Sequence, residues 1–288
     1  MTTTPTAPLS LRIAAPAKLN LFLHITGRRE DGYHELQTVF QMLDICDYLS
    51  FTATTDGQLY LEDDTDIPAQ DNLILKAASE LKKHAQPTAG VSIQLEKHLP
   101  MGGGVGGGSS NAASTLLALN QLWGIDLPVQ QLAGIGLKLG ADVPIFVHGH
   151  SAWAEGIGEI ITPVTLPKRW FVVVFPNQYI STAEVFCSKT LTRDAKICKI
   201  AAFLEHSNEC EFTNHCEPVV RDLYPNMEQA FETLNAFGQP KLTGTGACIF
   251  LAFERQEDAL LQYSAISALD NGWTVFLAEG LNQSPALQ

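Results

Sequence analysis

A run of glycines followed by two serines is the part of this sequence best suited to binding a charged group. Six glycines fall between Gly102 and Gly108, within PMGGGVGGGSSNA (100–112). A strand-like segment precedes the run, and an Ala- and Leu-rich helical segment follows it. Glycine lets the backbone approach a ligand closely, and a helix N-terminus presents unpaired N–H groups and the positive end of a dipole. The pattern predicts a site for a phosphate chain, with Ser109 and Ser110 adding hydroxyl donors.

Three alternative interpretations of the glycine run fit less well. A Walker A loop needs a lysine after its last glycine, and this run continues into serines. The spacing GxGxxG occurs at Gly102, Gly104 and Gly107, but the acid at the distance that a dinucleotide site requires, Asp126, follows the end of a helix rather than a strand. A flexible linker does not suit a run that joins an apolar helix directly.

Two charged residues could act beside a bound phosphate. Asp142 lies in the turn LGADVP (139–144), where an isolated aspartate is usually only a turn residue or a helix N-cap. Lys18 lies on a mostly apolar strand, where a single lysine usually extends its amine to solvent. Only their combination with the glycine run makes both residues candidates for chemistry.

Composition and charge exclude several classes of protein. Of the 288 residues, 45% are apolar and 17% are charged, which is not the composition of a disordered chain or a coiled coil. The formal net charge of −13 gives no overall attraction for nucleic acid or an anionic membrane, so we expect neither as a partner. The longest aliphatic-aromatic run, 170–175, is too short to cross a bilayer. The oligomeric state is left open.

The start of the chain and its cysteines bear on the cellular compartment. MTTTPTAPLS has no basic segment followed by an apolar stretch, so it does not resemble an export signal. The six cysteines form no CxxC pair, and we expect them to be free, reduced thiols. Both observations predict a cytoplasmic protein.

The first half of the chain predicts strands and then helices. Residues 9–25 alternate between faces, the turn GRREDGYHE follows, and residues 36–51 are apolar enough for a second strand, which together indicate a hairpin. The acidic stretch LEDDTD (61–66) lacks the central glycine and last carboxylate of an EF-hand, so we expect a solvated loop. Further expected elements are a helix capped by Asp71 or Asn72 and ending at Leu81, strands at 91–95 and 151–154, and helices after Gly108 and at 129–139.

Beyond about residue 165 the pattern restarts and predicts a second domain, in which helices cover an antiparallel sheet. We expect strands at 170–175, 248–253 and 274–277, and helices near Ala183 and at 227–237 and 257–269. The domains are placed at 1–165 and 166–288, and the fold class is α+β.

Three segments resemble the GHMP kinase superfamily: APAKLNLFLHITGRREDGYHE, PMGGGVGGGSSNA and LTGTGAC (242–248). Within the superfamily, the order of PAKLN, DGYH, GGGVGGGSSNAA, LGADVPIFVHGHSAWAEGIGE and GTGAC is similar to that in the kinases that phosphorylate a cytidine-linked methylerythritol in the non-mevalonate isoprenoid pathway. This likeness spans nearly the whole chain. Val105 stands where Leu is more usual, an aliphatic exchange that leaves the loop intact.

The resemblance implies a fold, a reaction and a site. The N-terminal domain would be similar to domain 2 of ribosomal protein S5, the C-terminal domain would be ferredoxin-like, and the active site would lie between them. The γ-phosphate of ATP would pass to the 2-hydroxyl of the cytidine-linked substrate. Asp142 would accept or orient the proton of that hydroxyl, and Lys18 would pair with Asp142 and stabilise charge on the transferred group. Mg²⁺ would bridge the phosphates with help from water and a serine of the loop.

The resemblance also assigns residues to two ligands. Tyr33 and Phe186 would stack on the two faces of the cytosine, and His34 would hydrogen-bond its edge. The full substrate set is Asn20, Tyr33, His34, Thr182, Phe186, Gly244, Thr245 and Gly246. The ATP set is Pro100, Met101, Gly102, Gly103, Gly104, Val105, Gly106, Gly107, Gly108, Ser109 and Ser110, with Lys97 and Asn72 beside the nucleotide base.

Features of the sequence argue against three alternative functions. A GHMP kinase for another small alcohol has no reason to carry the DGYH turn, and a nucleotide sensor without activity would be expected to have lost Lys18 or Asp142. A nicotinamide oxidoreductase would need the dinucleotide motif that the glycine run does not complete.

Overall fold

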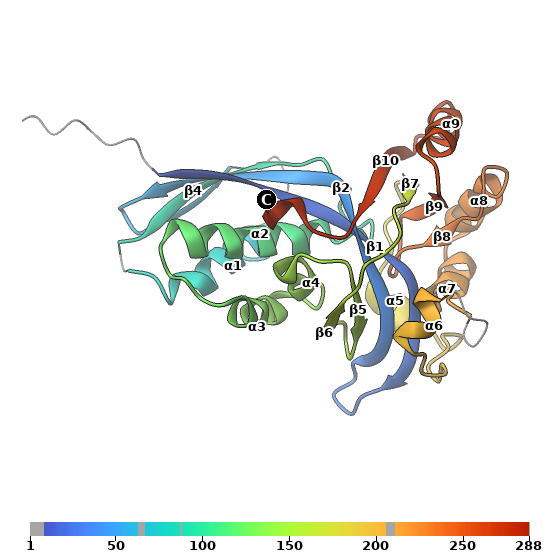
Figure 1. Cartoon of the computed structure of the whole chain (residues 1–288), viewed down its shortest axis with the longest axis horizontal. Helices are drawn as coiled ribbons and strands as arrows, with labels where there is room; N and C mark the ends of the chain where they lie inside the picture. The colour runs from blue at the N-terminus through green and yellow to red at the C-terminus, as the bar shows by residue number, and fades with distance from the viewer. Residues whose placement is uncertain (1–8, 63–66, 87, 206–210, 288) are drawn as a thin grey trace, which may run out of the picture.

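A long antiparallel hairpin runs through the whole molecule (Figure 1). The computed structural model describes residues 9–62, 67–86, 88–205 and 211–287, so most of the acidic stretch 61–66 lies outside it. The hairpin consists of β1 (Ser10–Arg28) and β2 (His34–Thr54), which confirms the expected pair and extends both strands. The register shifts between Pro16 and Lys18, and again between Asn20 and Leu23. These irregularities flank Lys18 and Asn20, the candidate site residues on β1.

The first half of the chain packs helices on one face of this sheet. The expected helices are α1 (Leu73–Lys82), α2 (Gly107–Leu122) and α3 (Val129–Leu139), and the side chain of Asn72 caps α1 by accepting from the N–H of Ile74. The strands are β3 (Leu59–Glu62), β4 (Gly90–Glu96), β5 (Ala152–Glu155) and β6 (Ile160–Pro163). A further helix, α4 (Val143–His148), was not expected. It begins directly after Asp142, and Pro144 lies in its first turn, a position that suits proline.

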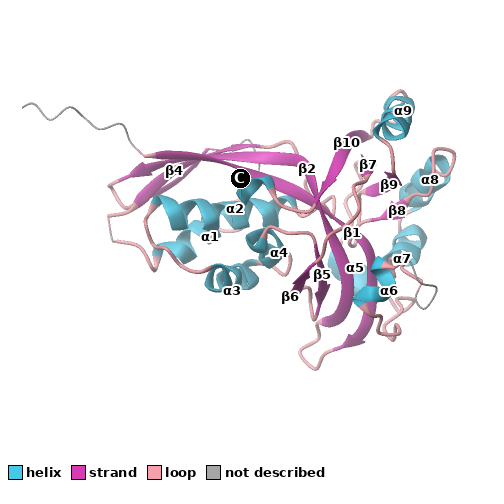
Figure 2. Cartoon of the chain, in the orientation of Figure 1, coloured by secondary structure: helices cyan, strands magenta, loops and turns pink. Residues whose placement is uncertain are grey.

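The second half forms an antiparallel sheet covered by helices, as expected (Figure 2). Its strands are β7 (Trp170–Phe175), β8 (Lys241–Leu242), β9 (Ile249–Phe253) and β10 (Thr274–Leu281). Its helices are α5 (Thr182–Cys187), α6 (Ile200–Leu204), α7 (Cys216–Leu223), α8 (Pro225–Leu234) and α9 (Gln256–Ser267), with a 3₁₀ turn at Pro285–Leu287.

The two halves share one sheet. Its strands follow the order β3-β4-β2-β10-β7-β9-β8, and β10 pairs with β2 through Gly280 opposite Leu43. The hairpin also serves two hydrophobic cores: Phe51 packs in the core under α1 to α4, whereas Leu23 and Ile25 pack in the core of the second half. A boundary at 165/166 stays a prediction, since β1 and β2 contribute to both sides of it.

A third apolar cluster lies between these two cores. Ala17 and Leu19 of β1 pack there with Phe171, with Val105 of the glycine run and with Cys248. The glycine run therefore rests on a buried layer to which both halves contribute.

The expectation of free thiols is only partly met. Cys46, Cys187, Cys216 and Cys248 are free, but Cys198 is disulfide-bonded, so the expectation is wrong at that position. Pairing depends on how close the fold brings two cysteines, which sequence spacing does not reveal. Among the residues that the structure describes, no helix is long and apolar enough to cross a membrane.

Candidate active site

A single cavity of about 1270 Å³ collects nearly all the residues that the sequence singled out. It lies between the glycine run, the β1–β2 turn, α5 and the turn at 244–246. The lining includes Lys18, Asn20, Tyr33, His34, Asn72, Lys97, Pro100, Met101, Gly102, Gly103, Gly104, Val105, Gly106, Gly107, Gly108, Ser109, Asp142, Thr182, Phe186, Gly244, Thr245 and Gly246. Of the residues assigned by resemblance, Ser110 alone does not line it, because its side chain is buried in α2.

The glycine run is held by backbone contacts to both halves of the protein. The N–H of Lys18 donates to the carbonyl of Val105 at 2.9 Å, and the N–H of Cys248 donates to the carbonyl of Gly103 at 2.8 Å. Gly104 has a φ of +74°, and a Cβ there would lie 2.7 Å from the carbonyl oxygen of Gly246. Two loops thus pack backbone against backbone, which only glycine at position 104 permits.

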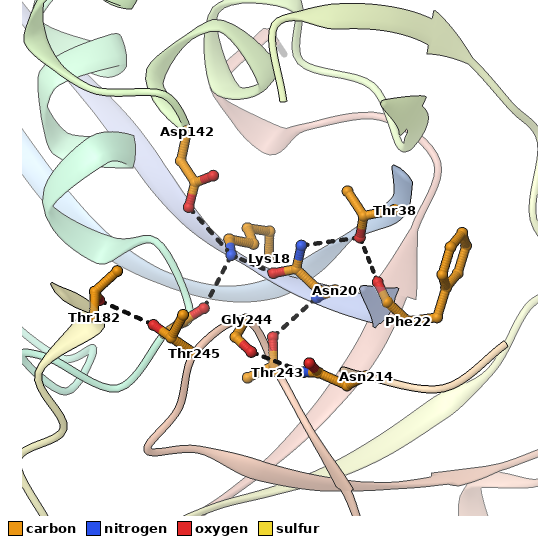
Figure 3. A network of polar contacts seen from close by, with 11 residues as sticks. Lys18, Asn20, Phe22, Thr38, Asp142, Thr182, Asn214, Thr243, Gly244 and Thr245 are labelled. Atoms are coloured by element: carbon orange, nitrogen blue, oxygen red, sulfur yellow. Dashed lines mark hydrogen bonds and ion pairs between the residues drawn. The ribbon is translucent and has the colours of Figure 1, made fainter. Parts of the chain in front are cut away.

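Lys18 is a buried cation with three acceptors (Figure 3). Its side chain is 3% exposed, and its Nζ lies 3.2 Å from Oδ2 of Asp142. The same Nζ donates to Oδ1 of Asn20 at 2.6 Å and to the carbonyl of Gly104 at 3.0 Å. These contacts occupy the three hydrogens of the ammonium group, so Lys18 does not extend to solvent as an isolated lysine on a strand would.

Asp142 supplies the accessible side of this pair. Its side chain is 36% exposed and lines the cavity directly before the first turn of α4. One carboxylate oxygen faces Lys18, which leaves the group able to accept a proton or a hydrogen bond from a ligand in the cavity.

Asn20 is held in place by two threonines that the sequence analysis missed (Figure 3). Its Nδ2 donates to Oγ1 of Thr38 at 3.0 Å, and the Thr38 hydroxyl donates to the carbonyl of Phe22 at 2.5 Å. Its backbone N–H donates to Oγ1 of Thr243 at 2.9 Å, at the residue where the second register shift of β1 begins. The amide oxygen of Asn20 is thereby directed toward Lys18.

The turn at 243–246 has its own support. Nδ2 of Asn214 donates to the carbonyl of Gly244 at 2.7 Å and to that of Leu242 at 2.9 Å. The hydroxyls of Thr182 and Thr245 lie 2.9 Å apart and join α5 to this turn. Asn214 was also missed, because no local pattern marks a side chain that stabilises a distant turn.

Aromatic residues form the end of the cavity near the β1–β2 turn. Tyr33 is 60% exposed there, and the rings of His34 and Phe186 stack with centroids 5.0 Å apart and planes 24° apart. Nε of Arg193 donates to Nε2 of His34 at 3.1 Å. Burial, together with the positive charges of Arg193 and Arg28, lowers the pKa of His34, so its ring is neutral at pH 7.

Lys97 and Asn72 also line the cavity, and Asn72 is the N-cap of α1. Nζ of Lys97 is 2.6 Å from Oδ2 of Asp47, a fully buried carboxylate that also accepts from the backbone N–H of Leu99. The Lys97 amine lies against Gly107, where a Cβ would be 3.3 Å from it. Lys97 thus borders the start of α2, and Asn72 lines the same cavity as the N-cap of α1.

The oxygen donors of the cavity fit a metal ion that is held mainly by its ligand. Among the described residues, no group of three or more His, Cys, Asp and Glu side chains could bind a metal alone. The hydroxyl of Ser109 lies beside Gly140, close to the turn that carries Asp142. Such a sparse set of oxygens suits Mg²⁺, which keeps several waters and binds through phosphates.

Comparison with known proteins agrees with this geometry. The model described as "GHMP kinases N terminal domain" matches residues 72–150, and "GHMP kinases C terminal" matches 191–271. A protein of Hahella chejuensis named 4-diphosphocytidyl-2-C-methyl-D-erythritol kinase is 51% identical over 96% of each chain, and one of Shewanella denitrificans with the same name is 47% identical over 98% of this chain and 97% of its own.

Solved structures show the same relationship. A crystal structure of 4-(cytidine 5'-diphospho)-2C-methyl-D-erythritol kinase is 32% identical, covers 94% of this chain and 99% of its own, and has a TM-score of 0.81. A homoserine kinase from Cytophaga hutchinsonii shares the fold at 16% identity over 99% of this chain and 98% of its own, with a TM-score of 0.70.

Proposed function

The chain belongs to the GHMP kinase family, and we propose that it transfers the γ-phosphate of ATP to the 2-hydroxyl of 4-diphosphocytidyl-2-C-methyl-D-erythritol. The two-domain α+β fold expected from the sequence is confirmed. The observation that carries the proposal is the Lys18–Asp142 pair, which lies in the same cavity as the glycine run and the aromatic end.

The glycine run and α2 would receive the phosphates of ATP. Gly106 is the N-cap of α2 in a left-handed conformation and provides no side-chain cap, and Gly107, Gly108 and Ser109 of the first turn line the cavity. Lys97 adds a cation where the helix begins. Phosphoryl transfer depends mainly on positioning and on stabilising charge, and these groups provide both.

Lys18 and Asp142 would act at the reacting atoms. Asp142 is accessible and would orient the attacking hydroxyl and take its proton late in the transfer, as a loose transition state allows. Lys18 is held rigidly by Asn20 and Gly104, so its charge is already in place to stabilise the phosphoryl group in flight. Asn20 and its threonine partners fix the geometry of this lysine.

Mg²⁺ would be held by the ATP phosphates, by water and by the hydroxyl of Ser109. When bound, it neutralises charge on the phosphates during transfer. The support for this placement is the position of Ser109 in the cavity beside the turn of Asp142.

The aromatic end would bind the cytosine. Tyr33 and Phe186 offer ring faces for stacking, and His34 offers a ring nitrogen to the base edge. Tyr33 and His34 come from the hairpin and Phe186 from α5, so both halves of the chain contribute to this pocket.

An assay of ADP release tests the proposal. The purified chain is supplied with ATP and Mg²⁺, and ADP formation is followed with 4-diphosphocytidyl-2-C-methyl-D-erythritol, with methylerythritol phosphate, and with homoserine or mevalonate. We expect turnover with the cytidine-linked substrate, near inactivity with the truncated one, and loss of turnover when Mg²⁺ is chelated. Comparable turnover with mevalonate or homoserine would assign the chain to another alcohol and overturn the proposal.

A further inference from the structure

Arg193 connects the two faces of the aromatic end of the cavity. Besides its contact with His34, Nη2 donates to the carbonyls of Phe186 at 2.8 Å and Ser188 at 2.7 Å, and Nη1 donates to the carbonyl of Leu191 at 3.0 Å. One guanidinium thus anchors both the backbone of Phe186 and the ring of His34. The side-chain rings of these two residues stack on each other. No local sequence pattern marks this arginine as a site residue.

The contact with His34 fixes where the imidazole carries its proton. A guanidinium nitrogen can only donate a hydrogen bond, so Nε2 of His34 must accept with its lone pair. A neutral imidazole whose Nε2 accepts carries its proton on Nδ1. A free histidine has no such constraint, and a protonated ring has no lone pair for Arg193.

The charges around His34 act in the same direction. The positive charges of Arg193 and Arg28 both oppose protonation of the ring and, with burial, lower its pKa. The neighbouring acids of the hairpin turn, Asp31 and Glu35, both lie near the guanidinium of Arg29. Nδ1–H is therefore the form of the ring available to a ligand in the cavity.

We propose that Arg193 is a positioning residue that fixes His34 as an Nδ1–H donor, and that this donor selects cytosine over uracil. The inference rests on the proposed function, in which His34 meets the edge of the base. Cytosine has a lone pair at ring nitrogen N3, whereas uracil has an N–H there. A fixed donor pairs with the lone pair and opposes the N–H, so the arginine sets base preference without touching the base.

Lysine cannot replace arginine in this role. The planar guanidinium uses four donors in a fixed fork, to one ring nitrogen and three carbonyls. Arg193→Lys keeps the charge but cannot reproduce this arrangement, so it isolates the hydrogen-bond geometry. Arg221→Lys is a matched control, because Arg221 is also multiply bonded, to Glu228 and Glu217, but does not line the cavity.

The proton position can be read directly by nitrogen-15 NMR of histidine-labelled protein. The His34 signals are identified by their loss in His34→Gln. In the wild type we expect them to show the Nδ1–H tautomer, and in Arg193→Ala we expect them to shift toward the Nε2–H tautomer. Arg221→Lys should leave them unchanged. An Nε2–H tautomer in the wild type, or the same Nδ1–H tautomer after both Arg193 substitutions, would overturn the proposal.

Base preference provides the second measurement. Calorimetric titration with cytidine diphosphate and uridine diphosphate should show a preference for cytidine in the wild type that falls about tenfold in Arg193→Lys, while ATP affinity is unchanged. Equal losses for both diphosphates and for ATP would indicate a merely structural role and refute the inference. These titrations need no turnover, so they test Arg193 even where the assay of ADP release fails.

Coupling between the two residues completes the test. If Arg193 acts through His34, the double variant Arg193→Lys/His34→Ala should lose no more base preference than His34→Ala alone. Additive losses would mean that Arg193 acts independently of His34, contrary to the proposal.

Discussion

Replacing Asp142 with asparagine should abolish most turnover while leaving the fold intact. The substitution keeps the shape of the side chain and removes its charge and its ability to take a proton. Lys18 retains its bonds to Asn20 and Gly104, so its buried ammonium is not left without acceptors. The change therefore isolates the chemistry of the carboxylate.

The structure sets the expected sizes of the two effects. Asp142 is 36% exposed, and an ion pair that is screened by solvent contributes at most about 1 kcal/mol, or a fall in Tm of about 2–4 °C. A group that orients the nucleophile or accepts its proton typically contributes about 10²- to 10⁴-fold to the rate. We expect kcat to fall by at least about 10²-fold with ATP affinity nearly unchanged.

Three measurements test whether Asp142 acts in catalysis: kcat from coupled ADP release, ATP affinity from calorimetry, and Tm. Glu279→Gln is the matched control, since Glu279 is a partly exposed acid 2.7 Å from Lys168 and does not line the cavity. Its kcat should stay within about twofold of wild type. If Asp142→Asn retains turnover within about threefold of wild type, the catalytic assignment is refuted; a large loss of ATP affinity or Tm would trace the effect to folding instead.

Three further outcomes follow from the structure. Gly104→Ala should cost at least about 2 kcal/mol of unfolding free energy in denaturant titrations, because its Cβ would meet the carbonyl of Gly246 at a positive φ; Gly108→Ala, whose Cβ would have ordinary contacts, should not. Tyr33→Ala should lower kcat/KM for the cytidine-linked substrate by an amount equivalent to roughly 1–3 kcal/mol of lost transition-state stabilisation, with the KM for ATP unchanged. An unaltered kcat/KM would contradict stacking. Burial lowers the pKa of His24, so the unfolded chain binds that proton first and stability should fall as pH drops below about 6.5; unfolding at pH 7.5 and 5.5 should show a smaller difference in His24→Gln.

Local patterns were sufficient to predict most of the elements that position the site. Alternation over 9–25 predicted β1, and the glycines before an apolar segment predicted the start of α2. Helix α4 was missed because Pro144 resembles the end of a helix as much as its first turn. Its position matters, since it places Asp142 at the cavity.

Contacts between distant segments could not be predicted in the same way. Thr38, Asn214 and Arg193 have ordinary local surroundings, and their importance arises only where the fold brings them to Asn20, Gly244 and His34. The residues alone indicated a phosphate site, and the choice of substrate came from the family resemblance.

The hairpin that serves both hydrophobic cores limits how the chain can be divided. Leu23 and Ile25 complete the core of the second half, so a fragment spanning 166–288 would expose the apolar surface that these residues cover. The first half would likewise lose β10, which pairs with β2. We therefore expect neither piece to fold alone, and we expect the intact protein to unfold in a single cooperative transition. Opening of the cavity must then come from bending of the long strands or from movement of the turns around it, because two continuous strands leave no free linker about which the halves could swing.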